Sequence, residues 1–319
     1  MTKVAFLNRF RKFFGLFAAI LFVAGGPVPD ADSLLRQFSA SKDASVGRSA
    51  AEVIAGLEKA VVLFKKQAFA AGVDSLQLVC GPALGLPDVA PVVEKLEQLR
   101  RQLPPDEPRL SARCHQFSAY LWQVKGLPHL AYPHLTAAVE CLAQASDAKN
   151  LGRAMTNLAI VVGDWGDVQQ KLDLLEAAAK QSASARDSAA LVSIHNNQGT
   201  TWLESLENPD SAMVYYQKAI DIFGEDCTGK PTVFIARCFF YKKDPKNCQI
   251  WLDKLKKIPG ALEDVELLGE RQQEVGDRRA AAGPRAQADL VLVAVAVGPD
   301  RNRARARHRL RLTKLGAEH

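Results

Sequence analysis

The feature that most constrains this chain is a pattern of small and large residues at helical spacing that occurs four times. Within each copy the marked positions lie four and then three residues apart, so they fall on one face of an α-helix. The four sets are Ala131/Leu135/Ala138, Lys171/Leu175/Ala178, Ala212/Tyr216/Ala219 and Cys248/Leu252/Leu255. Successive sets begin 40, 41 and 36 residues apart. Such an interval is typical of repeat proteins built from helix pairs.

A second predicted helix precedes each set and carries a small residue followed three positions later by a bulky one. These pairs are Ala119/Trp122, Ala159/Val162, Gly199/Trp202 and Ala236/Phe239. Turn-forming residues lie between the two helices of every copy, at 125–128, 163–167, 207–209 and 243–245. A single helix hairpin buries only one face, so several must stack to form a continuous core. The sequence therefore predicts an all-α fold, an α-solenoid of antiparallel helix hairpins.

The best copy of this pattern resembles the tetratricopeptide repeat (TPR) family. Gln198-Gly199 with Trp202, followed by Ala212, Tyr216 and Ala219, matches the family's small and large positions. The other copies are looser, and the resemblance covers about residues 107–258. It implies a right-handed superhelix in which the first helix of each pair lines a concave surface that binds a protein or peptide.

Composition and pattern divide the chain into four predicted segments. Residues 1–29 are a signal or anchor segment or an amphipathic targeting segment, and residues 30–106 form an N-terminal helical extension. Residues 107–270 form the TPR-like repeat domain, and residues 271–319 are an Ala/Arg-rich tail that we expect to be disordered. The abrupt change to Arg in this tail is also compatible with a misread reading frame.

The N-terminal segment leaves the localisation open. Basic residues precede the apolar run 13–24, an order typical of a secretory signal peptide. Residues 4–24 also form an amphipathic pattern that suits an in-plane membrane helix or an organellar presequence, or a first helix packed on the repeats. The six cysteines lack a C-x-x-C pair, which favours reduced thiols and a cytoplasmic or organellar location.

No motif indicates catalysis, a cofactor or a metal. The segment 224–230 has P-loop-like spacing, but Pro231 stands where Ser or Thr is needed and two acidic residues would repel phosphate. The histidines show no i, i+4 pair and no H-E-x-x-H motif. We therefore expect no enzyme activity, no catalytic residue, no cofactor and no metal site. The net positive charge is located at the two termini and the remaining body is mildly acidic, so we expect no nucleic-acid binding by the folded part.

The predicted function is that of an adaptor or scaffold holding a protein or peptide in the concave groove. Asn and Gln side chains suit pairing with an extended peptide backbone, and tyrosines suit anchoring of side chains. The predicted partner-binding residues are Gln116, Tyr120, Gln123, Thr156, Asn196, Thr200, Glu204, Arg237 and Tyr241. The alternatives are a membrane-attached or organellar assembly factor and the helical regulatory domain of an enzyme. We expect no small-molecule substrate.

Overall fold

The computed structural model describes residues 30–224 and 229–258, and the regular elements in these ranges are all α-helices. They belong to two compact units, one reaching Cys141 and the other beginning at Leu142. The helices of the first unit are α2 (Ala31–Ser39), α3 (Ala44–Lys65), α4 (Phe69–Ala83), α5 (Ala90–Arg100), α6 (Pro108–Val124) and α7 (Pro128–Gln144), whose last residues pass into the second unit. Those of the second unit are α8 (Ala148–Asp164), α9 (Val168–Ser184), α10 (Ser188–Glu204), α11 (Pro209–Phe223), α12 (Gly229–Tyr241) and α13 (Pro245–Lys257). The predicted all-α class is confirmed.

Helix starts in the second unit follow the capping residues of the sequence. The side chains of Asp147, Asp167, Asp187, Asn208 and Asp244 each accept a hydrogen bond from the backbone N–H three residues later. Such a cap satisfies an amide that the first turn of a helix leaves without a partner. The caps at Asn208 and Asp244, each followed by proline in the first helical turn, confirm the predicted starts of α11 and α13.

The repeat register predicted from the sequence is also confirmed. The marked positions of the second helices are buried in α7, α9, α11 and α13, with Lys171 alone remaining half-buried. Ala119, Ala159, Gly199 and Ala236 are buried in the first helices α6, α8, α10 and α12. Small residues thus lie where the helices of one hairpin approach each other, and bulky residues fill the remaining space.

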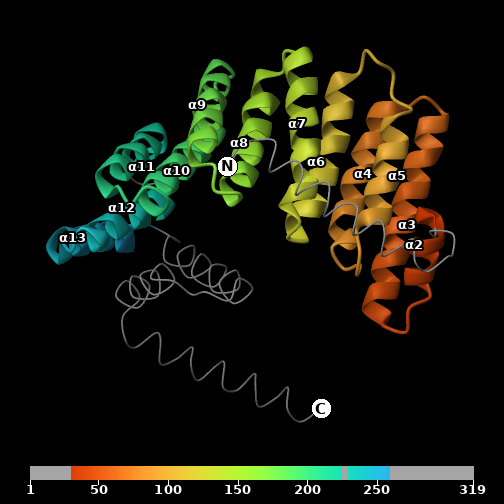
Figure 1. Cartoon of the computed structure of the whole chain (residues 1–319), viewed down its shortest axis with the longest axis horizontal. Coiled ribbons are helices and arrows are strands. Elements are labelled where there is room, and N and C mark those ends of the chain that lie inside the picture. Colours follow the sequence, from red (N-terminus) through yellow and green to blue (C-terminus); the bar gives the residue numbers. More distant parts are fainter. Residues whose placement is uncertain (1–29, 225–228, 259–319) are drawn as a thin grey trace, which may run out of the picture. The chain divides into compact units, whose positions relative to one another are not determined.

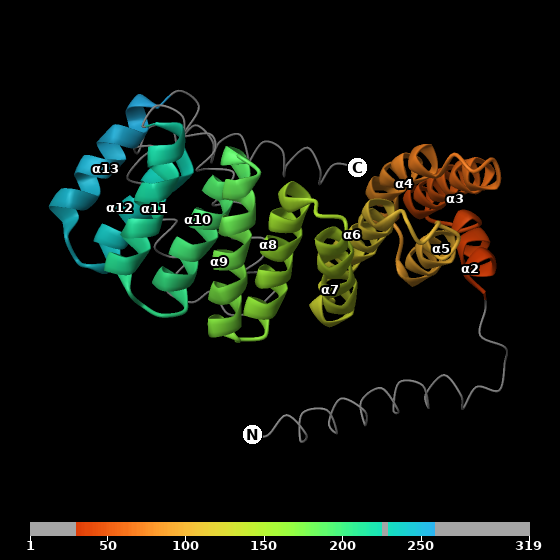
Figure 2. The same ribbon diagram turned by 90° about the horizontal axis from the view of Figure 1, so that it is seen from above.

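The second unit is a stack of three hairpins, α8/α9, α10/α11 and α12/α13 (Figures 1 and 2). Helix α9 also packs on α10, and α11 packs on α12, so each hairpin covers the apolar side of the next. Helix α10 contacts both α8 and α12, which places first helices of consecutive hairpins side by side. This arrangement is the predicted α-solenoid, and the adjacent first helices form one common face.

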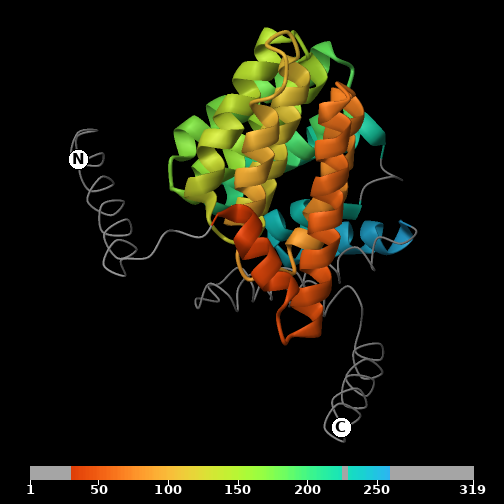
Figure 3. The same cartoon turned by 90° about the vertical axis from the view of Figure 1, so that its right-hand side faces the viewer.

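The first unit is built around the α3/α4 hairpin, against which α2, α5 and α6 pack. Helix α2 lies beside α3, as the red and orange ribbons of Figure 3 show, and also contacts α5. Helix α6 packs on α4 and α5. The core of the first unit includes the fully buried side chains of Val53, Leu76, Leu96 and Leu121. Helices α3, α4 and α5 lie in the region before the four predicted copies.

Helices α6 and α7 run antiparallel within the first unit. His115 of α6 lies against His134 of α7, and Ser111, one turn earlier in α6, lies against Cys141 near the end of α7. An early residue of one helix thus meets a late residue of the other, as in a hairpin. The α6/α7 pair is the first of the four predicted copies.

Several expectations concern residues outside the described ranges. The N-terminal segment 1–29, most of the P-loop-like segment 224–230 and the tail 271–319 belong to this group. In the described part of the chain, no helix combines the length and the apolar character needed to cross a membrane. The domain bounds at 106/107 and 270/271 stay predictions.

Candidate functional site

The described residues form an open cavity of about 250 Å³ between α8 and α10. Both are first helices of their hairpins, so the cavity lies on the face where the sequence predicts partner contacts. Its lining consists of Arg153, Thr156, Asn157, Ala189, Ala190 and Ser193. Arg153, Asn157, Ala189 and Ser193 are exposed, whereas Thr156 and Ala190 form the buried floor. The cavity is therefore shallow, with a small apolar floor and a polar rim.

An ion pair holds Arg153 at the rim of this cavity. Its Nε and Nη2 atoms lie 2.9 and 2.8 Å from Oδ2 of Asp187. Asp187 is buried and also caps α10 by accepting a hydrogen bond from the amide of Ala190. Half of the Arg153 side chain nevertheless remains exposed. The result is a positively charged group whose orientation is set before a ligand arrives, which lowers the entropy cost of binding.

Two of the predicted contact residues, Thr156 and Asn196, lie on these helices. Thr156 lines the cavity, and its hydroxyl donates a 2.8 Å hydrogen bond to the carbonyl of Gly152 in its own helix. Asn196 follows Ser193 by about one turn of α10, and its buried Oδ1 atom makes no hydrogen bond to the residues that the structure describes. A buried amide oxygen without a partner is costly, and the Asn196 side chain would have to rotate outward to accept a hydrogen bond from a ligand.

Three further predicted residues, Thr200, Glu204 and Arg237, make contacts between helices instead. The Thr200 hydroxyl lies 3.2 Å from the hydroxyl of Tyr216 in α11. Arg237 of α12 is only 1% exposed, and its Nη2 lies 2.9 Å from Glu204 of α10. The expectation that Arg237 faces solvent is therefore wrong, because the carboxylate on the adjacent first helix draws the guanidinium into the interior. These residues join hairpins, and their proposed contact with a partner stays a prediction.

The remaining predicted residues do not belong to the cavity. Gln116, Tyr120 and Gln123 lie on α6 in the first unit, where Tyr120 is exposed and both glutamines are half-buried. Tyr241 lies at the end of α12, is exposed, and has the Arg237 guanidinium 5.8 Å from its ring centre. The nine residues are thus divided between the two units, and neither unit contains all of them.

Sequence reasoning missed Arg153, Asn157 and Ser193, although a signal for them was present. A shift of 40 residues, the separation of Ala159 and Gly199 in the second and third copies, relates Arg153 to Ser193 and the predicted Thr156 to Asn196. Equivalent positions of successive repeats lie on the same face of a solenoid. Arg153 and Ser193 lie three residues before Thr156 and Asn196, about one helical turn away, so the helical period would have selected both.

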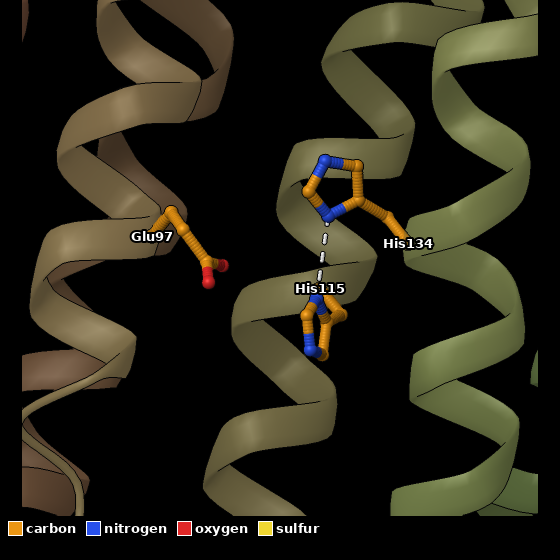
Figure 4. A group of neighbouring side chains, drawn as sticks. All are labelled: Glu97, His115 and His134. Atoms are coloured by element: carbon orange, nitrogen blue, oxygen red, sulfur yellow. Dashed lines mark hydrogen bonds between the residues drawn. The ribbon is translucent and has the colours of Figure 1, made fainter.

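A separate polar cluster in the first unit consists of Glu97, His115 and His134, one residue each from α5, α6 and α7 (Figure 4). One potential metal-ligand atom from each residue lies within 4.8 Å of the others. Burial lowers the pKa of His115 to about 4 and also lowers that of His134. Hydrogen bonds from Arg100 lower the pKa of Glu97. At neutral pH the cluster therefore holds two neutral imidazoles and one carboxylate, the forms that bind metal ions.

Comparison with known proteins identifies the fold. No protein-family model matches the chain, and no curated protein matches it. Among solved structures, the chain is similar to BtubC (BKLC) from P. vanneervenii, with 16% sequence identity and a TM-score of 0.60 over 68% of this chain and 92% of that one. At this identity the likeness concerns the fold alone. Together with the stacked hairpins, it shows that the chain is a TPR-like helical repeat protein.

Two other solved structures are similar at lower TM-scores. A putative kinesin light chain of Podosopora anserina with nearly identical TPR-like repeats is 14% identical, with a TM-score of 0.45 over 65% of this chain and 95% of that one. The pilF protein of Pseudomonas aeruginosa is 17% identical, with a TM-score of 0.41 over 85% of this chain and 99% of that one. Neither adds to the conclusion about the fold.

Proposed function

We propose that this chain is a non-catalytic adaptor whose second unit binds an extended segment of a partner protein across α8 and α10. The observation that carries the proposal is the open cavity between two adjacent first helices. Solenoids present ligand-binding surfaces on such a face, because each repeat contributes equivalent positions to it.

The side chains around the cavity suit a peptide backbone with an acidic or carbonyl group. Asn157 on α8 offers an amide and Ser193 on α10 a hydroxyl, and each can donate to one peptide group and accept from another. Arg153, oriented by Asp187, supplies a charged donor for a carboxylate or carbonyl oxygen. These groups are spread along two parallel first helices, so they suit an elongated ligand.

The size of the cavity favours a single side chain over a small-molecule substrate. Small-molecule pockets usually enclose about 300–1,000 Å³ and bury most of the ligand. This cavity is smaller, is open to solvent and has alanine in its floor. We therefore infer that one side chain of the partner inserts between α8 and α10, while neighbouring residues of the partner form hydrogen bonds with the polar side chains at the rim. Contacts through Gln116, Tyr120, Gln123 and Tyr241 remain predictions for other parts of the partner.

Filling the cavity tests this proposal. Ala189 is exposed and lines the cavity, so Ala189→Trp would occupy the space without disturbing the core. The matched control is Ala183→Trp on α9, which replaces another exposed helical alanine that is not part of the cavity lining. The wild-type chain first identifies partners by affinity purification, and peptides that tile the partner are then titrated against all three proteins.

We expect Ala189→Trp to weaken binding of the active peptide at least about tenfold, equivalent to about 1.4 kcal/mol. The control should bind within about twofold of the wild type, because a change outside the contact surface leaves the binding free energy nearly unchanged. Thermal unfolding of both variants should match that of the wild type. Unchanged peptide affinity in a folded Ala189→Trp protein would show that the partner binds elsewhere.

A further inference from the structure

The histidine pair of the first unit has the spacing of two ligands on one metal ion. Nδ1 of His115 lies 3.3 Å from Nδ1 of His134. Zinc binds imidazole nitrogen at about 2.0–2.1 Å with tetrahedral geometry, so two nitrogen ligands of one ion lie about 3.3 Å apart. An ion placed beside this pair would therefore require little movement of either ring.

The third ligand is supplied by the Glu97 carboxylate on the neighbouring helix. In Figure 4 this carboxylate extends from α5 towards the two imidazoles. Its ligand oxygen is within 4.8 Å of the histidine ligand atoms, and no hydrogen bond to either ring holds it in place. Two ligands about 2.1 Å from one tetrahedral ion lie about 3.4 Å apart, so a shift of the carboxylate towards the imidazoles completes the set.

From this arrangement we propose that Glu97, His115 and His134 form a binding site for a divalent transition-metal ion, with Zn²⁺ as the expected occupant. Two imidazoles and one carboxylate are a ligand set that zinc accepts, with the fourth position left to water. Harder ions such as Mg²⁺ and Ca²⁺ prefer sites made of oxygen ligands alone. The ligand set therefore selects against them.

Arg100 orients the carboxylate but also limits the affinity of the site. Its Nη2 and Nε atoms donate to the two Glu97 oxygens at 2.5 and 2.8 Å, and Arg101 lies 3.4 Å from one of them. Each carboxylate oxygen has two lone pairs, so Glu97 can accept from Arg100 and bind an ion at the same time. The nearby positive charges oppose a cation, however. We therefore expect binding that is selective for transition metals but weaker than that of a four-ligand structural zinc site.

Cys114 adjoins His115 in the sequence, but its thiol is not among the ligand atoms that lie within 4.8 Å of one another. The ion would join three helices whose ligands are 18 and 19 residues apart in the sequence. Because the unfolded chain does not hold these residues together, an ion bound only by the folded state stabilises the first unit.

The test is a Zn²⁺ titration of the full chain after chelator treatment, using calorimetry and competition with a metal indicator. The variants are His115→Gln, His134→Gln and Glu97→Gln, and circular dichroism verifies that each remains helical. The matched control is His129→Gln, which changes an exposed histidine of α7 outside the cluster. A Co²⁺ titration adds a spectroscopic readout, since visible absorption reports tetrahedral coordination and thiolate charge transfer would reveal cysteine ligands.

We expect one Zn²⁺ per chain at the strongest site and a rise in the unfolding temperature on binding. Loss of either histidine should weaken that binding on the order of 100-fold, and Glu97→Gln on the order of tenfold, whereas His129→Gln should bind as the wild type does. Binding of Mg²⁺ should be undetectable under the same conditions. The proposal is overturned if the wild type binds no Zn²⁺, if both histidine variants bind it unchanged, or if the Co²⁺ spectrum shows thiolate ligands.

Discussion

Replacement of Gly199 by alanine tests the close approach of α10 and α11 on which the repeat packing depends. A Cβ atom built at Gly199 would lie 2.5, 2.7 and 2.7 Å from three ring atoms of Tyr216. The ring has no room to retreat, because it is fully buried and stacks on Phe234 with the ring centres 5.0 Å apart. The added methyl group must therefore separate the helices or displace the ring.

Three contributions determine the size of the effect. Overpacking of a tight core costs about 1–3 kcal/mol. Displacement of the ring also disturbs the 3.2 Å hydrogen bond between Tyr216 and Thr200, a loss of about 0.5–1.5 kcal/mol. Alanine gains about 1 kcal/mol over glycine from its higher helix propensity. The net destabilisation is therefore about 0.5–3.5 kcal/mol.

Denaturant unfolding followed by circular dichroism measures this difference, with Gly81→Ala as the control. Gly81 lies in α4, is exposed, and a Cβ atom there would meet no atom within 4 Å. The control should change the free energy of unfolding by less than about 1 kcal/mol, because the higher helix propensity of alanine is opposed by the steric restriction that Pro82 places on the residue before it. On a Tyr216→Leu background, Gly199→Ala should lose its destabilising effect, since the clashing ring is gone. A Gly199→Ala protein as stable as the wild type would refute the close contact.

Three further predictions concern buried groups. Glu204→Ala should destabilise the chain by about 3–5 kcal/mol in denaturant unfolding, because it removes a carboxylate that pairs with the buried Arg237, and adding Arg237→Met should restore most of the loss. Asp187→Ala should lower the free energy of unfolding by about 0.5–2 kcal/mol through loss of the α10 cap, with a lower unfolding temperature as the readout; an unchanged value would contradict the capping role. Cys114, whose pKa burial raises to about 12, should react with iodoacetamide far more slowly in the native chain at pH 8 than in denaturant, as mass spectrometry would show; rapid native alkylation would contradict its burial.

Helix positions and the repeat register were predictable because the signals for them are local. Burial of Ala212 and Tyr216 follows from their spacing within one helix, and the start of α11 follows from Asn208 and the proline after it. The resemblance of this copy to TPR repeats then indicated which helices form a pair. These inferences require only neighbours within a few turns of the same chain segment.

The environment of polar residues was not predictable in the same way. Arg237 fits a solvent-facing pattern in its own helix, but Glu204 on another helix draws it into the interior. The predicted site residues were correspondingly dispersed. Thr200 contacts Tyr216 on another helix, and Arg153, which forms part of the cavity rim, was not among the predicted residues. Whether a polar side chain remains free depends on partners that a helical pattern cannot reveal.

The sequence by itself determined that this chain folds into helix hairpins and which face of each helix is apolar, because hydrophobic burial follows a short helical period. Only the tertiary structure decided that Glu97, His115 and His134 meet, since no helical spacing connects residues on three different helices. It also decided that Arg153 is held by Asp187 at the edge of a cavity. Charge pairing and metal-ligand geometry depend on distances between side chains in space, and packing of the hairpins sets those distances.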